Sequence, residues 1–255
     1  MEEWRLLLIE TPDQAAMNLA VEEAIFLEKT RTDGPPTVRF WRNRLAVVIG
    51  YSQNVISEVN LELCKEKNIQ VVRRFSGGGT VFQDLGNLNY TIVLETNHRL
   101  VKHRDLVQSF KVLCSGVLNG LKRFGVEPVF VPPSDIFINK KKVSGNSQSR
   151  KKDIILHHGT VLVSSDLSLL AKVLDAPRHV GKPTGVASKR SPVTNLVDEA
   201  NQPVSMERVQ EALQRSFEQT WSVNLVRDNL TPEEEALANA LYVEKYSKKE
   251  WNFWR

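Results

Sequence analysis

The chain has 255 residues, of which 41% are hydrophobic and 25% charged, with a formal net charge of +4. This balance excludes a disordered chain, and we expect one enzyme-sized domain over residues 1–255. The longest apolar runs fall far short of the roughly 20 residues that cross a bilayer, and the acidic start Met1, Glu2 and Glu3 is unlike a secretory signal. We therefore expect a cytoplasmic protein with no membrane segment.

The first hundred residues predict short strands separated by helices. Thr11, Pro12 and Gln14 have the types and spacing of an N-cap, a first helical turn and a capping box, so a helix should start at Thr11. The apolar residues that follow recur at helical spacing and form one stripe, which should pack against a sheet. The other elements expected here are strands at 5–9, 37–41, 46–51, 69–73, 80–82 and 88–94, of which the second and third resemble a hairpin, and a helix at 61–66.

The second part of the chain contains the clearest helix, at 106–124, where Phe110, Leu113, Val117 and Leu121 keep the core-facing period. The other elements expected here are strands at 128–131, 135–139 and 154–163, helices at 167–174 and 206–221, and a mostly helical tail at 232–251. Without repeats or a convincing linker, this order predicts an α+β (α/β) fold, with a mixed central sheet flanked by helices.

The two cysteines, Cys64 and Cys114, lie in segments that read as helices. Neither has a second cysteine at the spacing of metal ligands. We expect both thiols to be reduced and buried, and we assign no residue to a metal site.

The most informative segment is 73–84, in which Arg73 and Arg74 precede the three glycines at 77–79. Glycine runs are poor strand formers, and without Cβ atoms their backbone N–H groups can approach a ligand. The two arginines would supply charge for a phosphate or carboxylate. By itself a glycine run favours a flexible turn, and no Lys-Ser/Thr pair follows it, so it is not a P-loop.

Two further motifs lie downstream. Residues 142–146 combine Lys142 with a small-residue turn, and 157–160 carry a histidine pair on an expected strand. Taken alone, a lysine in a run of three should be exposed to solvent. The alternation of a strand should place one ring of the pair His157 and His158 in the core and the other outside.

In this order the three motifs resemble the lipoate-protein ligase family, whose members share a fold with biotin ligases and octanoyltransferases. The family carries an arginine-rich glycine loop, a Lys-Val-Ser-Gly turn and a His-His-Gly strand, which correspond here to 73–79, 142–145 and 157–160. Residues 185–196 also look like the family segment that folds over the adenylate. The resemblance spans nearly the whole chain and implies a biotin/lipoyl protein ligase-like fold.

The resemblance implies a role for each matching residue. Lys142 matches the catalytic lysine that contacts both the acyl carbonyl and the α-phosphate. Arg74 matches an arginine near the nucleotide, Asp135 falls at an acidic position near it, and His158 lies on a strand that borders the acyl tunnel. The other implied binding residues, in and after the glycine loop, are Gly77, Gly78, Gly79, Thr80, Val81 and Phe82.

The implied reaction is ATP-dependent activation of lipoate or octanoate to acyl-AMP, followed by transfer to a lysine of a lipoyl-acceptor domain. The acceptor would be an acyltransferase subunit of a 2-oxoacid dehydrogenase or a glycine-cleavage H-type protein. A carboxylate that approaches a polyphosphate needs its charge neutralised, a task suited to Lys142 and arginine with Mg²⁺. In the second step the Lys142 ammonium would stabilise charge on the anhydride oxygens.

The sequence departs from the family pattern in two places. Gln83 stands where many relatives have histidine, so the acyl pocket should be tuned differently. Many relatives also continue into a small C-terminal accessory domain, which we do not expect here, and in some a separate small protein takes its role. We hypothesise that this chain alone transfers from a preformed acyl-adenylate but activates free lipoate poorly.

Three other functions compete. An octanoyl or lipoyl transferase acting between carrier proteins needs a reactive thiolate, for which Cys64 and Cys114 on apolar helical segments look unsuited. A biotin ligase should show a Gly-Arg-Gly-Arg-type loop, which differs from 76–79. A non-enzymatic nucleic-acid binder could use the basic residues, but the order of the motifs disfavours a specific nucleic-acid partner.

Overall fold

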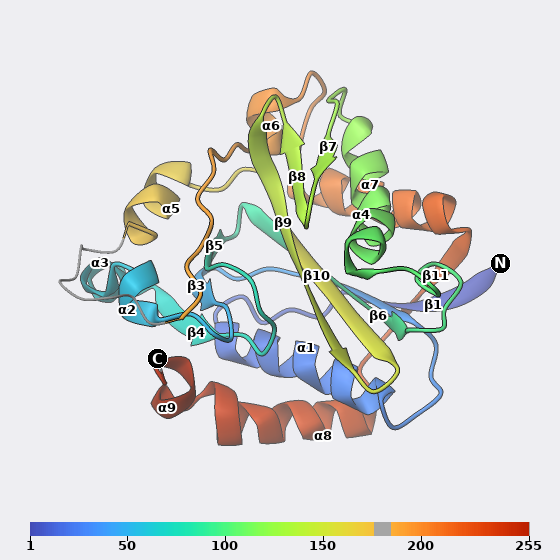
Figure 1. The fold of residues 1–255 in the computed structure, drawn as a ribbon, viewed down its shortest axis with the longest axis horizontal. Coiled ribbons are helices and arrows are strands. Elements are labelled where there is room, and N and C mark those ends of the chain that lie inside the picture. The colour runs from blue at the N-terminus through green and yellow to red at the C-terminus, as the bar shows by residue number, and fades with distance from the viewer. Residues whose placement is uncertain (176–184, 255) are drawn as a thin grey trace.

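The computed structural model describes residues 1–175 and 185–254, which form an eight-stranded mixed sheet and a three-stranded sheet among helices (Figure 1). The strands are β1 Glu2–Leu7, β2 Thr37–Trp41, β3 Leu45–Ile49, β4 Gln70–Arg73, β5 Val81–Asp84, β6 Asn87–Glu95, β7 Val129–Val131, β8 Asp135–Ile138, β9 Lys141–Lys151, β10 Ile154–Leu162 and β11 Val223–Asp228. The helices are α1 Ala15–Lys29, α2 Val55–Glu58, α3 Leu61–Glu66, α4 Leu106–Lys122, α5 Leu167–Val173, α6 Leu196–Glu199, α7 Met206–Trp221, α8 Pro232–Leu241, the π-helical η1 Tyr242–Tyr246, and α9 Lys249–Asn252.

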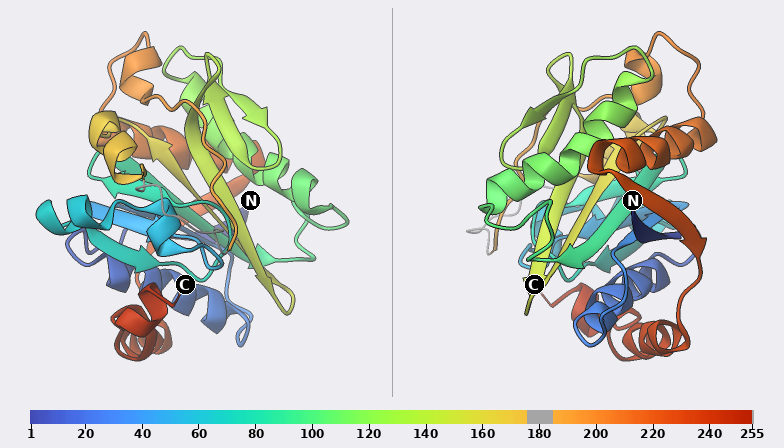
Figure 2. Two further views of the ribbon diagram at one scale, coloured as in Figure 1. Left: turned by 60° about the vertical axis from the view of Figure 1, so that its left-hand side comes forward. Right: turned by 90° about the vertical axis from the view of Figure 1, so that its right-hand side faces the viewer.

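The large sheet has the order β11-β1-β2-β6-β10-β9-β8-β7, and the small sheet has the order β4-β3-β5. In the large sheet β1 pairs in parallel with β11 and β2, and the other pairs are antiparallel. Helices α4 and α7 pack together on one face of this sheet, and α1 and α8 pack together on the other (Figure 2). Because both faces are covered, the central strand β6 buries nearly every side chain.

The predicted architecture, a mixed sheet flanked by helices, is confirmed, and so is the long helix α4. Asp105 caps α4 in a capping box with Gln108, which fixes its start. The prediction that Cys64 and Cys114 are reduced and buried is confirmed as well. No helix in the described part of the chain is long and apolar enough to cross a membrane.

The expected hairpin of 37–41 and 46–51 is wrong, because β2 pairs with β1 and β6 whereas β3 pairs with β4 and β5. The polar connection between them carries the chain from one sheet to the other. Arg42 and Arg44 are tied to Glu10 and Asp13, which anchors the connection beside α1.

The predicted helix start at Thr11 is also wrong, since α1 begins at Ala15 with Gln14 as N-cap. The Thr11 backbone N–H and hydroxyl both donate to Asn18 Oδ1, so the hydroxyl is not used to cap the helix. Strands β9 and β11 were not predicted. The turn expected at 142–146 lies inside β9, a polar strand of the sequence KKVSGNSQSRK.

Candidate active site

A cavity of about 230 Å³ lies between the glycine loop, the ends of β6, β9 and β10, and the segment at 185–195. A second cavity of about 400 Å³ adjoins it and is lined by α5 and the other side of the same segment. Residues that line both are Thr80, Val81, Lys142, Gly145, Thr160, Ser188 and Lys189. The two cavities therefore form one continuous site, and the residues that line both lie at its shared centre.

Most of the residues expected from the sequence meet at this site. Among the described residues, Gly77 alone of the expected set lines neither cavity, although its carbonyl accepts hydrogen bonds from Arg74 and Ser147. Phe82 lines the second cavity only. The expected residues that line the first cavity are Arg74, Gly78, Gly79, Thr80, Val81, Asp135, Lys142 and His158.

Arg74 stabilises the glycine loop through hydrogen bonds to its carbonyl groups. Its buried guanidinium donates to the carbonyls of Gly77 at 2.6 Å and Gly79 at 2.8 Å, and also to Val48 O. Burial lowers the pKa of Arg74 to about 10, which still leaves it charged near neutral pH. Gly78 has φ +90°, and a Cβ there would meet Arg74 Nη2 at 2.9 Å. The loop thus needs glycine at this position.

The expectation that both arginines supply charge to a ligand is wrong for Arg73. This side chain is fully buried and donates to the carbonyls of Gly50, Tyr51 and Gln53. It also binds carbonyls of the C-terminal tail, and the Arg73 backbone N–H donates to Asn252 Oδ1. Arg73 therefore fastens the tail to the back of the glycine loop.

Lys142 and Asp135 form an ion pair at the centre of the site. The Nζ to Oδ1 distance is 2.8 Å, and both side chains are about one quarter exposed, 26% and 25%. The Lys142 side chain is therefore partly buried, unlike that of a typical lysine in a run of three. The Lys142 side chain lies over Gly145, where a Cβ would come within 2.7 Å of its Cε and Nζ. Glycine at this position lets the ammonium reach the junction of the two cavities.

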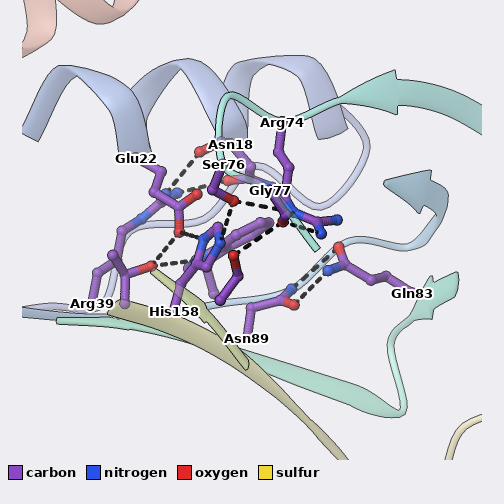
Figure 3. Close-up of polar contacts among 12 residues, drawn as sticks. Asn18, Glu22, Arg39, Arg74, Ser76, Gly77, Gln83, Asn89 and His158 are labelled. Carbon is purple, nitrogen blue, oxygen red and sulfur yellow. Dashed lines mark hydrogen bonds and ion pairs between the residues drawn. The ribbon is translucent and has the colours of Figure 1, made fainter. Parts of the chain in front are cut away.

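His158 links the sheet to the glycine loop (Figure 3). Its Nε2 lies 2.7 Å from Ser76 Oγ and its Nδ1 lies 2.9 Å from Glu22 Oε1, while Ser76 Oγ accepts from Arg74 Nε. Burial would raise the pKa of Glu22, but His158 and the Thr91 hydroxyl outweigh it, and the pKa lies below its usual value. The ionised carboxylate holds the histidine ring in position.

The expectation that one histidine ring lies outside is wrong, because helices cover both sheet faces. His157 is fully buried on the face opposite His158, where Gln148 Nε2 lies 3.2 Å from its Nδ1. The Phe110 ring contacts it edge-on. Burial, with a smaller effect from His158, lowers the pKa of His157 to about 3, so the ring is neutral.

Sequence reasoning missed several residues that line the first cavity, notably Glu22, Trp41 and Asn89. Glu22 carried a signal in the sequence, since it interrupts an apolar stretch of α1. In the structure its side chain is fully buried. Gln83, noted as a departure, is held between Asn43 and Asn89, with both contacts at 2.7 Å. These buried amides set the polarity of one wall of the cavity.

The segment at 185–195 lies along the glycine loop and β9. The Ser188 hydroxyl accepts hydrogen bonds from the Thr80 backbone N–H at 3.0 Å and from Gln53 Nε2 at 2.9 Å. Its backbone N–H donates to Glu58 Oε1. Further along, the Lys142 N–H donates to Pro192 O. The segment therefore forms one wall shared by the two cavities.

The site thus consists of two adjoining cavities that meet at Lys142, next to a glycine loop. The sequence matches the family model described as the lipoyl protein ligase A/B catalytic domain over residues 14–218. The chain belongs to this family of lipoate and octanoate ligases and transferases.

Relatives of both kinds are similar over nearly the whole chain. A lipoate-protein ligase A subunit 1 from Thermoplasma acidophilum is 35% identical, over 98% of this chain and 96% of the relative. The octanoyltransferase LipM from Brevibacillus brevis is 31% identical, over 100% of both chains. Sequence similarity alone therefore leaves ligase and transferase activity both open.

Two solved structures share the fold. A lipoate-protein ligase A bound with ATP has a TM-score of 0.86 at 34% identity, and the match covers 99% of both chains. A bi-partite lipoate protein ligase, described with its E2 lipoyl domain, from Thermoplasma acidophilum has a TM-score of 0.87 at 34% identity, covering 99% of this chain and 97% of that one. The fold is that of the lipoate ligases.

Proposed function

We propose that this chain is an ATP-dependent lipoate-protein ligase, which activates lipoate or octanoate as acyl-AMP and transfers the acyl group to a lysine of a lipoyl-acceptor domain. The observation that carries this proposal is the position of Lys142, whose side chain lines both cavities. One ammonium at the shared centre would contact the acyl carbonyl and the α-phosphate together. It would act in both half-reactions.

The walls of the two cavities suit the two substrates. The first cavity has apolar walls from Leu19, Trp41 and Val48, and would take the acyl chain. The second is bordered by Phe82, Leu162, Leu170 and other apolar side chains, and would take the adenine ring. Gly78 and Gly79 line the first cavity next to Thr80, which lines both, and the α-phosphate would sit against this backbone.

Lys142 starts from its ion pair with Asp135, so an incoming carboxylate or phosphate competes for the ammonium. As the acyl oxygen attacks the α-phosphorus, the ammonium would neutralise the two approaching anions. Mg²⁺ bound by the phosphates would be held by Asp135, since this ion prefers one or two carboxylates plus phosphate oxygens, and it would supply further neutralisation. Among the described residues, no group of three His, Cys, Asp or Glu side chains forms a metal site by itself.

The competing transferase reaction needs a cysteine thiolate next to the acyl group. In the described part of the chain neither Cys64 nor Cys114 lines either cavity. Burial raises the pKa of Cys64 to about 11 and raises that of Cys114 further above its ordinary value. Both thiols are therefore protonated near neutral pH, which favours the adenylate route.

We also propose two protein partners for this catalytic domain. One is the lipoyl-acceptor domain, either an acyltransferase subunit of a 2-oxoacid dehydrogenase or a glycine-cleavage H-type protein. The other is a small accessory chain that assists adenylation, supported by the similarity to a bi-partite ligase. With preformed acyl-AMP the accessory chain should not be needed.

The test is the intact mass of an acceptor domain incubated with the full chain. One reaction contains lipoate, ATP and Mg²⁺ with or without the accessory protein, and another contains preformed lipoyl-AMP. We expect modification of one acceptor lysine from lipoyl-AMP, and a fall of about 10²- to 10³-fold in the rate with Lys142→Ala, because a donor to the developing charge is lost. Lys141→Ala is the matched control, since the Lys141 side chain is half exposed, pairs with Glu199 and lines neither cavity in the described part of the chain.

Two outcomes would overturn the proposal. In one, the double variant Cys64→Ser and Cys114→Ser loses acyl transfer while it remains folded, which would support a thioester transferase. In the other, the wild-type chain leaves the acceptor unmodified with lipoyl-AMP and also with lipoate, ATP and the accessory protein.

A further inference from the structure

The cations near the junction of the two cavities differ in how fully they are already neutralised. The Arg74 guanidinium is committed to loop carbonyls, Lys142 is paired with Asp135, and Arg190 is paired with Asp175 at 3.2 Å. Lys189 lines both cavities and has no ion-pair partner among residues 1–175 and 185–254. Among the described cations at the junction, Lys189 is therefore the one whose charge no described carboxylate or carbonyl of the protein offsets.

The main chain around Lys189 is fixed although its side chain is exposed. The preceding residue, Ser188, is held by its backbone N–H to Glu58 and by its hydroxyl to Thr80 and Gln53. Three residues later, Pro192 O accepts the Lys142 N–H at 2.8 Å. The backbone that carries the Lys189 side chain is thus anchored to the glycine loop before Lys189 and to β9 after it.

We infer that Lys189 binds the β- and γ-phosphates of the nucleotide and stabilises pyrophosphate as it leaves. This inference rests on the proposed function, and it gives the two lysines separate tasks. Lys142 serves the acyl group and the α-phosphate at the shared centre, whereas Lys189 serves the part of ATP beyond the α-phosphate. A mobile ammonium on an anchored backbone is suited to a phosphate that must depart.

The first half-reaction shows where that charge is needed. A carboxylate oxygen of the acid forms a bond to the α-phosphorus, and the bond from that phosphorus to the α,β-bridging oxygen breaks. The bridging oxygen keeps the electron pair and leaves as part of pyrophosphate. Negative charge therefore grows on the β-phosphate in the transition state, where a nearby ammonium lowers the barrier.

Lys189 should therefore matter for ATP and for adenylation, but not for transfer, because acyl-AMP has no β- or γ-phosphate. Equilibrium binding separates these roles and needs no accessory protein. The experiment titrates ATP and AMP into the full chain with Mg²⁺ by isothermal calorimetry, for wild type, Lys189→Met, Lys189→Arg and the charge-matched control Lys111→Met, which is exposed on α4.

We expect Lys189→Met to weaken ATP binding about tenfold, as for loss of one charge-assisted phosphate contact, and to leave AMP binding within about twofold. Lys189→Arg should restore ATP binding, and Lys111→Met should match wild type.

Equal weakening of ATP and AMP by Lys189→Met, or no weakening of either, would overturn the inference while leaving the proposed function intact. If the wild-type chain bound neither nucleotide, even with the accessory protein present, the proposed function and the inference would both fail.

Discussion

Gly78 and Gly77 are neighbours in the glycine loop but carry different structural demands. Gly78 has φ +90° and lies so close to the Arg74 guanidinium that a Cβ would meet Nη2 at 2.9 Å. A Cβ on Gly77 would have nothing within 4 Å, and its φ is outside the left-handed region. The loop therefore owes its shape to one glycine more than to the other.

We predict that Gly78→Ala lowers the free energy of unfolding by about 1–3 kcal/mol, because the backbone is strained and Arg74 is displaced. Gly77→Ala should stay within about 0.5 kcal/mol of wild type. Urea unfolding followed by tryptophan fluorescence measures both. Equal losses in the two variants would show that the conformation of the loop is not set by Gly78.

The sequence pointed to residues that line the cavities more readily than to residues that support the glycine loop behind them. Lys142 and Arg74 stand in short motifs that the sequence shows directly, and Asp135 was assigned from the family resemblance alone. The burial of Arg73 against the C-terminal tail depends on Asn252, which is distant in the chain. Such long-range partners leave no local pattern, so the orientation of Arg73 could not be predicted.

At the scale of elements, the segment at 185–195 gives the site its shared wall through a few hydrogen bonds. Ser188 is the main contact, because its hydroxyl accepts from the Thr80 N–H and from Gln53 Nε2.

We predict that Ser188→Ala raises the KM for preformed lipoyl-AMP by about 30-fold with little change in kcat. In the wild type the two hydrogen bonds of the Ser188 hydroxyl stabilise this wall by roughly 1 kcal/mol each. They affect the binding of lipoyl-AMP more than the reacting atoms. Initial-rate kinetics with an acceptor domain measures this. An unchanged KM in Ser188→Ala would show that the wall is held by other contacts.

Elements with a strong apolar period were predictable, and those shaped by the site were not. The apolar stripe and capping residues of α4 fix it locally. Strand β9 lacks such a signal, because much of its length faces the cavity and solvent and carries Ser, Asn, Gln and Lys. The separation of β2 from β3 was hidden as well, since it depends on contacts between the connecting turn and the segment that precedes α1.

At the scale of the whole molecule, the two helical layers make the interior sensitive to acid. His157 is buried in the layer beneath α4, where its Nε2 lies 4.0 Å from Cys114 Sγ. The pKa of His157 is lowered from 6.5 to about 3, mainly by burial. Between these pH values His157 binds a proton in the unfolded chain but not in the folded chain, so the free energy of unfolding falls as the pH falls.

We predict that the wild-type chain loses about 1.6 kcal/mol of unfolding free energy between pH 6.5 and pH 5 through this one group, at up to about 1.4 kcal/mol per pH unit. This range lies above the region where Glu22, whose pKa is lowered from 4.5, loses its stabilising contribution. His157→Gln removes the titrating ring and should flatten the pH dependence by close to one proton, whatever its effect on stability at pH 7.5. His103→Gln, on the surface, is the control and should keep the wild-type slope. Urea unfolding at four pH values gives the slopes, and equal slopes for wild type and His157→Gln would mean that the ring is protonated inside the folded protein.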